Sequence, residues 1–166
     1  MHALDLFGRP DGAQPVGTVV SLHRSSGGVP KFAITSARVT AAGMEGDRQR
    51  NLRHHGGPDR ALCLYSADLI DALRAEGHPV APGTLGENVL VRGVPWDGLG
   101  PGVRLRLGEV EIELTAFAHP CRNIAGSFRV GAIERVSVKR HPGWSRVYAR
   151  VLRPGLLAQG DVVVVL

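Results

Sequence analysis

The sequence predicts a mainly β protein with a minor α component, whose short strands form a closed or partly closed β-barrel. Its 22 glycines and 11 prolines separate short apolar segments, which is typical of many strands joined by tight turns. Residues 103–117 carry the alternation of a hairpin, and only residues 66–77 have a convincing helical pattern. Short strands protect their edges best by closing into a barrel.

The hairpin is the clearest element. Apolar and charged residues alternate on both sides of Gly108-Glu109, which suits a two-residue turn that begins with glycine. This register places Arg104 and Arg106 opposite Glu111 and Glu113 on the outer face of the predicted sheet.

The predicted helix follows a short apolar strand. Ser66 can cap its N-terminus, Asp68 favours its first turn, and Gly77 ends it after an apolar stripe. Further strands are expected at residues 16–22, 61–65, 89–92, 146–151 and 162–166. No linker divides the chain, so we expect one domain over residues 1–166 with its core in residues 16–166.

Composition excludes several classes of protein. With 43% hydrophobic residues the chain is too apolar to be disordered, and no apolar run approaches the ~18 residues that a membrane span needs. The net charge is +5, but the basic residues are spread along the chain without interleaved aromatic residues. We therefore expect neither a nucleic-acid nor a membrane partner, whereas an anionic small molecule suits the many arginines.

The two cysteines, Cys63 and Cys121, are too few for a disulfide framework. Residues 1–11 contain an acidic residue and no apolar run, so they do not resemble a secretory signal. These observations favour a cytoplasmic location.

The two cysteines differ in their surroundings. Cys121 follows His119-Pro120 and precedes Arg122, just beyond the predicted hairpin, so its thiol should lie in a loop where cations can stabilise the thiolate. Cys63 has apolar neighbours on both sides and is predicted to be a core residue.

Three glycine-containing loops can approach a ligand closely. They span residues 43–48, 54–60 and 82–88, and each carries polar or charged side chains beside the glycines. Each loop alone is an unspecific signal. The chain contains no P-loop, dinucleotide fingerprint, paired CxxC motif or serine elbow.

Taken in order, these motifs resemble those of the MOSC domain family, which is named after the C-terminal domain of molybdenum cofactor sulfurase. The resemblance runs from about residue 16 to the end of the chain. Within the family, the chain is similar to stand-alone bacterial members of the YiiM type. It rests on Val29-Pro30-Lys31, residues 43–48, 55–61 and 82–88, Pro120-Cys121, and residues 155–161.

The resemblance implies a MOSC-type β-barrel that binds the molybdenum cofactor, a molybdopterin. It implies that Cys121 is the catalytic residue and the metal ligand, or carries sulfur as a persulfide. The cofactor-binding residues that it implies are Lys31, Arg38, Arg48, His55, Gly56, Gly57, Arg60, Glu87, Asn88 and Arg122.

Two functions follow from this resemblance. The first is a molybdenum-dependent oxidoreductase that reduces N-hydroxylated compounds, with electrons supplied by a separate donor protein. The alternative is a module that delivers sulfur from a Cys121 persulfide to an acceptor metallo-enzyme, with pyridoxal phosphate expected only in a partner enzyme. A barrel that has lost its metal and binds another anion is a third interpretation.

Overall fold

The computed structural model describes residues 13–48 and 57–166. The strands are β1 (Pro15–Arg24), β2 (Phe32–Ile34), β3 (Ser36–Thr40), β4 (Gly43–Met44), β5 (Leu62–Ser66), β6 (Val89–Arg92), β7 (Arg104–Leu107), β8 (Val110–Phe117), β9 (Val147–Arg153), β10 (Gly155–Ala158) and β11 (Val162–Val165). The helices are α1 (Ala67–Ala75) and the short 3-10 helices η1 (Pro58–Arg60), η2 (Trp96–Gly98), η3 (Arg122–Ser127) and η4 (Ile133–Val136).

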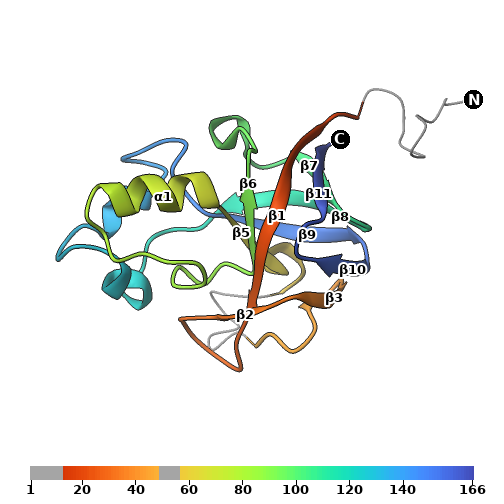
Figure 1. Cartoon of the computed structure of the whole chain (residues 1–166), viewed down its shortest axis with the longest axis horizontal. Helices are drawn as coiled ribbons and strands as arrows, with labels where there is room; N and C mark the ends of the chain where they lie inside the picture. Colours follow the sequence, from red (N-terminus) through yellow and green to blue (C-terminus); the bar gives the residue numbers. More distant parts are fainter. Residues whose placement is uncertain (1–12, 49–56) are drawn as a thin grey trace, which may run out of the picture.

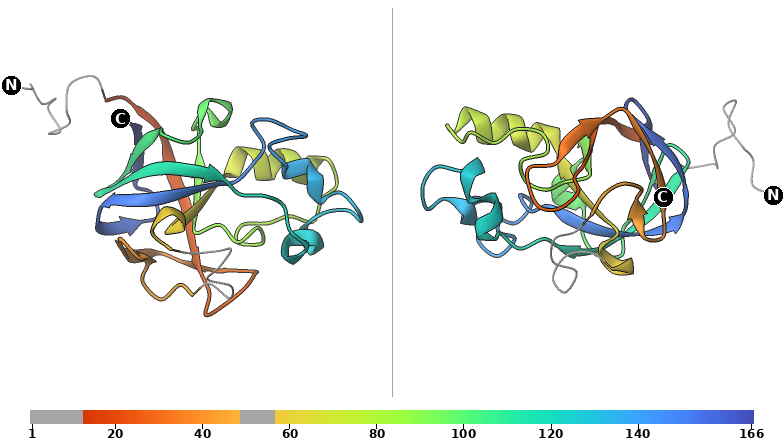
Figure 2. Two further views of the ribbon diagram at one scale, coloured as in Figure 1. Left: turned by 180° about the vertical axis from the view of Figure 1, so that it is seen from behind. Right: turned by 90° about the horizontal axis from the view of Figure 1, so that it is seen from below.

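Seven strands form a closed ring, which confirms the predicted barrel. The larger sheet has the order β11-β7-β8-β9-β5-β6-β1-β2, and a further antiparallel pairing of β11 with β1 closes it. Figure 2 shows the strands following one another around this ring when the molecule is seen from below. Closure pairs the strand edges that an open sheet would leave free.

The only α-helix in the described residues connects the only parallel pair of strands found there. β5 and β6 run parallel, and α1 crosses between them on the outside of the barrel (Figure 1). Ser66 caps α1 as predicted, because its hydroxyl oxygen accepts a 3.2 Å hydrogen bond from the Leu69 N–H. Among the described residues, no helix combines the length and the apolar character needed to cross a bilayer.

The predicted hairpin is confirmed with its register. β7 and β8 pair so that Arg104 lies opposite Glu113 and Arg106 opposite Glu111. Gly108 adopts a positive φ of 56°, which the turn requires and which glycine adopts without steric cost.

Four short strands were not expected from the sequence, namely β2, β3, β4 and β10. β10, β3 and β4 form a separate three-stranded sheet. These strands are two to five residues long, so too few side chains alternate in them to distinguish a strand from a loop.

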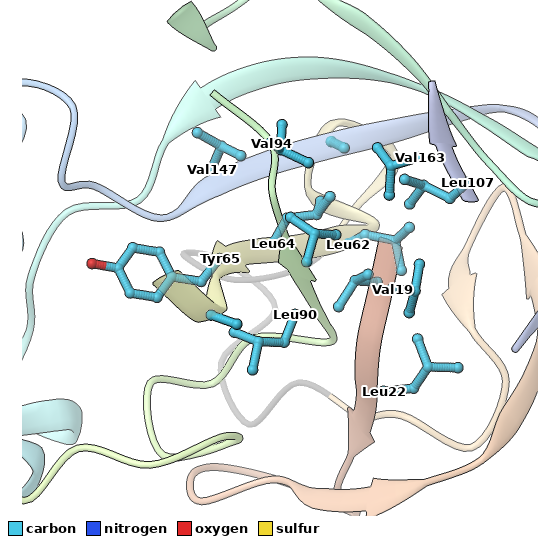
Figure 3. Close-up of a cluster of buried hydrophobic side chains, with 14 of the residues drawn as sticks. Val19, Leu22, Leu62, Leu64, Tyr65, Leu90, Val94, Leu107, Val147 and Val163 are labelled. Atoms are coloured by element: carbon cyan, nitrogen blue, oxygen red, sulfur yellow. The ribbon is translucent and has the colours of Figure 1, made fainter. Parts of the chain in front are cut away.

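The hydrophobic core fills the barrel and continues beneath α1. Leu22, Leu62, Leu64 and Leu107 are completely buried, and they meet from three strands of the ring, β1, β5 and β7 (Figure 3). Tyr65 lies at one side of this cluster, and its hydroxyl donates a 2.8 Å hydrogen bond to the Trp144 carbonyl.

The core position of Leu107 gives a test of the closed ring. Leu107 lies on β7, between β11 and β8, so Leu107→Ala should lower the free energy of unfolding by about 3 kcal/mol through lost contacts and a residual cavity. Urea denaturation measures this loss. Leu156→Ala is the matched control, because Leu156 on β10 is 52% exposed and its truncation should change stability by less than about 0.5 kcal/mol. Equal losses in the two variants would contradict this packing.

Candidate functional site

Cys121 lies just beyond the end of β8, as the sequence predicts. The strand ends at Phe117, and Cys121 is the N-terminal flanking residue of η3, in an extended conformation. The residue is partly exposed and forms no disulfide. Its carbonyl accepts a 3.1 Å hydrogen bond from the Ile124 N–H, which ties Cys121 to the turn that follows it.

Cys63 is a core residue, as predicted. It lies within β5, is 5% exposed, and packs with Ala118 and Tyr148 in a small cluster beside the main core. Burial raises the pKa of its thiol to about 11, which makes the thiolate rare near neutral pH. Of the two thiols, the one at Cys121 is therefore the accessible one.

Tyr148 connects Cys121 to a second predicted site residue. The Arg60 guanidinium lies over the Tyr148 ring, 5.0 Å from its centroid. Burial is the main cause that raises the pKa of Tyr148 to about 12, and the neighbouring thiols of Cys63 and Cys121 add to it. Arg60 and Cys121, from loops far apart in the sequence, thus both lie close enough to Tyr148 to affect its pKa.

A second group of predicted residues meets inside the protein. Lys31 Nζ lies 2.6 Å from Asp47 Oδ2, and both side chains are 5% exposed. Asn88 Nδ2 donates a 2.9 Å hydrogen bond to the same carboxylate oxygen, and Asn88 Oδ1 accepts a 3.0 Å bond from the Cys63 N–H. Lys31 and Asn88 therefore bind other groups of the protein, and their polar atoms are already occupied.

Glu87 lies beside this group and is completely buried. The Gly83 N–H donates to Glu87 Oε1, while Glu87 Oε2 has no hydrogen-bond partner. Burial raises the pKa of Glu87 to about 7, although the Gly83 bond and the charge of Arg146 favour the carboxylate. His23 Nδ1 lies 3.9 Å from Glu87 Oε1, and burial lowers the pKa of His23. The two pKa shifts favour a neutral His23 beside a Glu87 carboxyl that keeps its proton to a higher pH than usual.

Gly83 allows these segments to approach each other. It has a positive φ of 86°, and its carbonyl accepts a 2.9 Å hydrogen bond from the Lys31 N–H. A Cβ at this position would collide with the Lys31 carbonyl oxygen. The backbone contact between the loops of Lys31 and Glu87 therefore requires glycine.

Arg146 is a buried arginine that the sequence analysis does not identify as a site residue. Its Nη1 donates a 2.8 Å hydrogen bond to the Leu85 carbonyl and its Nη2 donates a 3.0 Å bond to the His119 carbonyl. The alternation in residues 146–151 suggests one apolar face, but Val147, Tyr148 and Ala149 are all buried. Both faces of this part of β9 are covered, and the sequence pattern alone does not show this.

The remaining predicted residues belong to neither of these groups or lie outside the described residues. Arg38, Arg48 and Arg122 have exposed side chains, Arg38 on β3, Arg48 directly after Asp47, and Arg122 at the start of η3. Gly57 flanks η1 with a φ of 84°. His55 and Gly56 lie outside the described residues. Within residues 13–48 and 57–166, no three or more His, Cys, Asp or Glu side chains are grouped as metal ligands.

Sequence reasoning also missed Asp47 and His23. Asp47 lies in the glycine-containing loop 43–48, and the signal that could have identified it is the opposite charge of Lys31 in the preceding motif. His23 is the second-last residue of β1 and lies between Leu22 and Arg24, so its burial follows only from the fold.

Strand directions explain why distant loops meet. β8 runs antiparallel to β9, and β1 runs antiparallel to β6, which is parallel to β5. The end of β8 before Cys121 therefore lies beside the start of β9 after Arg146. In the same way, the end of β1 at His23 lies beside the start of β6 after Asn88, and the Asn88 N–H bonds to the Cys63 carbonyl at 2.7 Å.

Comparison with known proteins identifies the family. A family model of the MOSC domain matches residues 51–164. This chain belongs to the MOSC domain family. The match confirms the resemblance predicted from the order of the sequence motifs, and the MOSC domain is associated in general with the molybdenum cofactor.

Three related proteins resemble this MOSC chain over part of their length. YflK of Bacillus subtilis (strain 168) is 32% identical over 118 residues, which are 70% of this chain and 52% of YflK. YiiM of Escherichia coli (strain K12) is 33% identical over 104 residues, which are 59% of this chain and 46% of YiiM. A Gibberella moniliformis protein named Reductase is 29% identical over 130 residues, which are 75% of this chain and 22% of that protein. The chain thus spans about half of the bacterial relatives and less than a quarter of the fungal one.

Solved structures share the fold. The crystal structure of YiiM from Escherichia coli superposes with a TM-score of 0.67 at 23% identity and covers 92% of this chain and 70% of YiiM. YiiM from Geobacillus stearothermophilus superposes with a TM-score of 0.65 at 21% identity, over 93% of this chain and 75% of that protein. The barrel seen here is therefore the MOSC fold.

The raised pKa of Glu87 predicts a pH-dependent stability. Between its usual pKa of 4.5 and about 7, the folded chain keeps a proton on Glu87 that the unfolded chain has released. The contribution of Glu87 to the free energy of unfolding therefore falls as the pH rises through this window and is constant above it. Glu87→Gln should gain stability relative to the wild type, on the order of a few kcal/mol, between about pH 4.5 and about pH 8.

Urea denaturation at a series of pH values measures this difference. The lowered pKa of His23 makes its own contribution to the free energy of unfolding rise with pH. Because His23 is present in both proteins, the comparison between them isolates the effect of Glu87. Glu134→Gln, at an exposed position on η4, controls for the loss of a surface carboxyl. Parallel pH curves for the wild type and Glu87→Gln would show that Glu87 does not retain its proton.

The different burial of the two cysteines predicts selective alkylation. Iodoacetamide should modify Cys121 at least about tenfold faster than Cys63 in the folded chain, because Cys63 is buried and its pKa is raised. Mass spectrometry of the digested protein resolves the two sites. The rates should converge when the protein is alkylated in denaturant, and similar rates in the folded chain would contradict the assignment of Cys121 as the accessible thiol.

Proposed function

We propose that this MOSC chain binds the molybdenum cofactor through Cys121 and reduces N-hydroxylated compounds. The observation that carries the proposal is the position of Cys121, a free and partly exposed thiol at the end of a barrel strand. A thiolate is a soft ligand suited to a transition metal, and the residue before the thiol is a proline that stiffens its loop. The relative named Reductase supports this class of reaction.

The residues around Cys121 fit the group that the family implies. Arg60 supplies a cation near the same tyrosine as Cys121, and Arg122 follows the thiol in the chain with an exposed side chain. Guanidinium groups bind phosphate in a bidentate way, so Arg48, Arg60 and Arg122 are the proposed ligands of the cofactor phosphate. Arg38 and the backbone of Gly56-Gly57, with His55, remain proposed contributors to the same binding.

The roles of Lys31, Glu87 and Asn88 are proposed to be indirect. Lys31 is paired with Asp47, and the side chains of Glu87 and Asn88 are completely buried. Removing one partner of a buried ion pair lowers the free energy of unfolding by about 3–5 kcal/mol. We therefore assign these residues a supporting role, in which they hold the backbone of the cofactor loops in place.

When bound, the molybdenum centre supplies the two-electron chemistry that breaks an N–O bond. The overall reaction consumes two electrons and two protons for each N-hydroxyl group and releases one water molecule. A separate donor protein supplies the electrons in this proposal. The contribution of the chain itself is to hold the metal at the Cys121 sulfur and to neutralise the cofactor phosphate with arginine side chains.

Metal analysis of protein from a host that makes the cofactor tests the proposal. Wild-type protein should contain molybdenum in a near-stoichiometric amount, and Cys121→Ala should lose nearly all of it because the thiolate ligand is gone. Cys63→Ala is the matched control and should retain the metal. The loaded wild type, supplied with a chemical reductant, should reduce an N-hydroxylated amidine.

Other outcomes assign other functions. Protein without molybdenum but with cyanide-labile sulfur that disappears in Cys121→Ala would favour the sulfur-delivery alternative. Protein with neither would contradict both and leave a barrel that binds another anion. Metal loss in Cys63→Ala, with unfolding behaviour unchanged, would show that the wrong cysteine has been assigned.

A further inference from the structure

Arg146 joins two loops that both lead to predicted site residues. Its guanidinium donates to the Leu85 carbonyl, two residues before Glu87, and to the His119 carbonyl, two residues before Cys121. Only 5% of the residue is exposed. The two bonds, of 2.8 and 3.0 Å, have the geometry of hydrogen bonds from a charged donor.

The backbone near Arg146 strengthens the connection to the Cys121 loop. The Ala118 N–H donates a 2.9 Å hydrogen bond to the Arg146 carbonyl. The Ser145 hydroxyl lies 3.2 Å from the Ala118 carbonyl oxygen and 2.8 Å from that of Arg146. Residues 145–146 therefore contact residues 118–119 through both backbone and side chains.

The bonds of Arg146 leave part of its guanidinium without a partner. Arg146 Nε is buried and has no hydrogen-bond partner. A buried charge is costly unless it is compensated, and the side chain is directed to neutral carbonyls rather than to a carboxylate. Such an arrangement suits a residue that determines where two loops lie, since an apolar side chain could fill the same space without that cost.

We propose that Arg146 is a positioning residue that fixes the His119 carbonyl, and with it the Pro120-Cys121 turn, against the Leu85–Asn88 loop. The planar guanidinium reaches both carbonyls at once, and this fixes the separation between them. The backbone two residues before Cys121 is therefore held at a fixed distance from the backbone two residues before Glu87. This inference depends on the proposed function in one respect: it takes Cys121 as the reactive residue.

Hydrogen exchange on the chain without cofactor tests the proposal directly. Arg146→Met removes both donors at nearly constant length. Exchange at the Ala118 and Ile124 amides should rise about tenfold or more, because a bond from a charged donor no longer restrains the turn. The Leu114 amide, which bonds to the Val103 carbonyl at the end of the hairpin away from the Gly108 turn, should keep its wild-type rate.

Arg146→Lys separates charge from geometry. Lysine keeps the charge but has no planar fork, so it should show the same local rise in exchange. The protonated form of Glu87 can tolerate the loss of the neighbouring cation, and this favours folding of the Met variant. Arg150→Met is the matched control, because Arg150 lies on β9, the strand that begins directly after Arg146, is half exposed, and pairs with Asp59 and Glu113.

The outcomes distinguish this proposal from the proposed function. Alkylation of Cys121 should become several-fold faster in Arg146→Met while that of Cys63 is unchanged, and retained molybdenum should fall in protein loaded with cofactor. The proposal would be overturned if exchange in Arg146→Met rose equally at the Leu114 amide or did not rise at the Ile124 amide. Wild-type exchange rates in Arg146→Lys would also overturn it. A local rise in a chain that binds no molybdenum would leave the positioning role intact and contradict the proposed function.

Discussion

The directions of the strands in the closed ring determine which loops meet, and the candidate site depends on this. Because β8 and β9 are antiparallel, the turn that leaves β8 lies beside the segment that enters β9. The parallel pairing of β5 with β6 places Asn88 beside Cys63 in the same way. Cys121, Arg146 and Asn88 are distant in sequence, and no local preference of the chain brings them together.

The structure separates the predicted site into an inner and an outer part. The inner part contains Lys31, Asp47, Asn88, Glu87 and His23, whose polar atoms mostly bind one another or the backbone. The outer part contains the partly exposed Cys121 and the Arg60 guanidinium, which lies over the Tyr148 ring. The sequence predicts that the charge of Lys31 is available for a ligand, but in the fold Asp47 neutralises it.

Local patterns predicted the elements that depend on local interactions. The β7–β8 hairpin and the Ser66 cap follow from alternation, a glycine turn and one side-chain bond within three residues. Cys121 was also predictable, because a proline and flanking polar residues indicate a loop. Arg146 and Asp47 were not, since each is buried by contacts with segments far away in the chain, and an arginine in an alternating strand normally indicates a solvent-facing position.

The pairing of β1 with β11 has a consequence for how the protein is made. β1 contains residues 15–24 and β11 residues 162–165, so the first and last strands of the barrel are neighbours. On a ribosome, β1 cannot complete its hydrogen bonds on that side until β11, at residues 162–165, has been translated. The nascent barrel therefore exposes an unpaired edge until β11 is made, and contacts of such high sequence separation favour slow folding and a need for protection against aggregation.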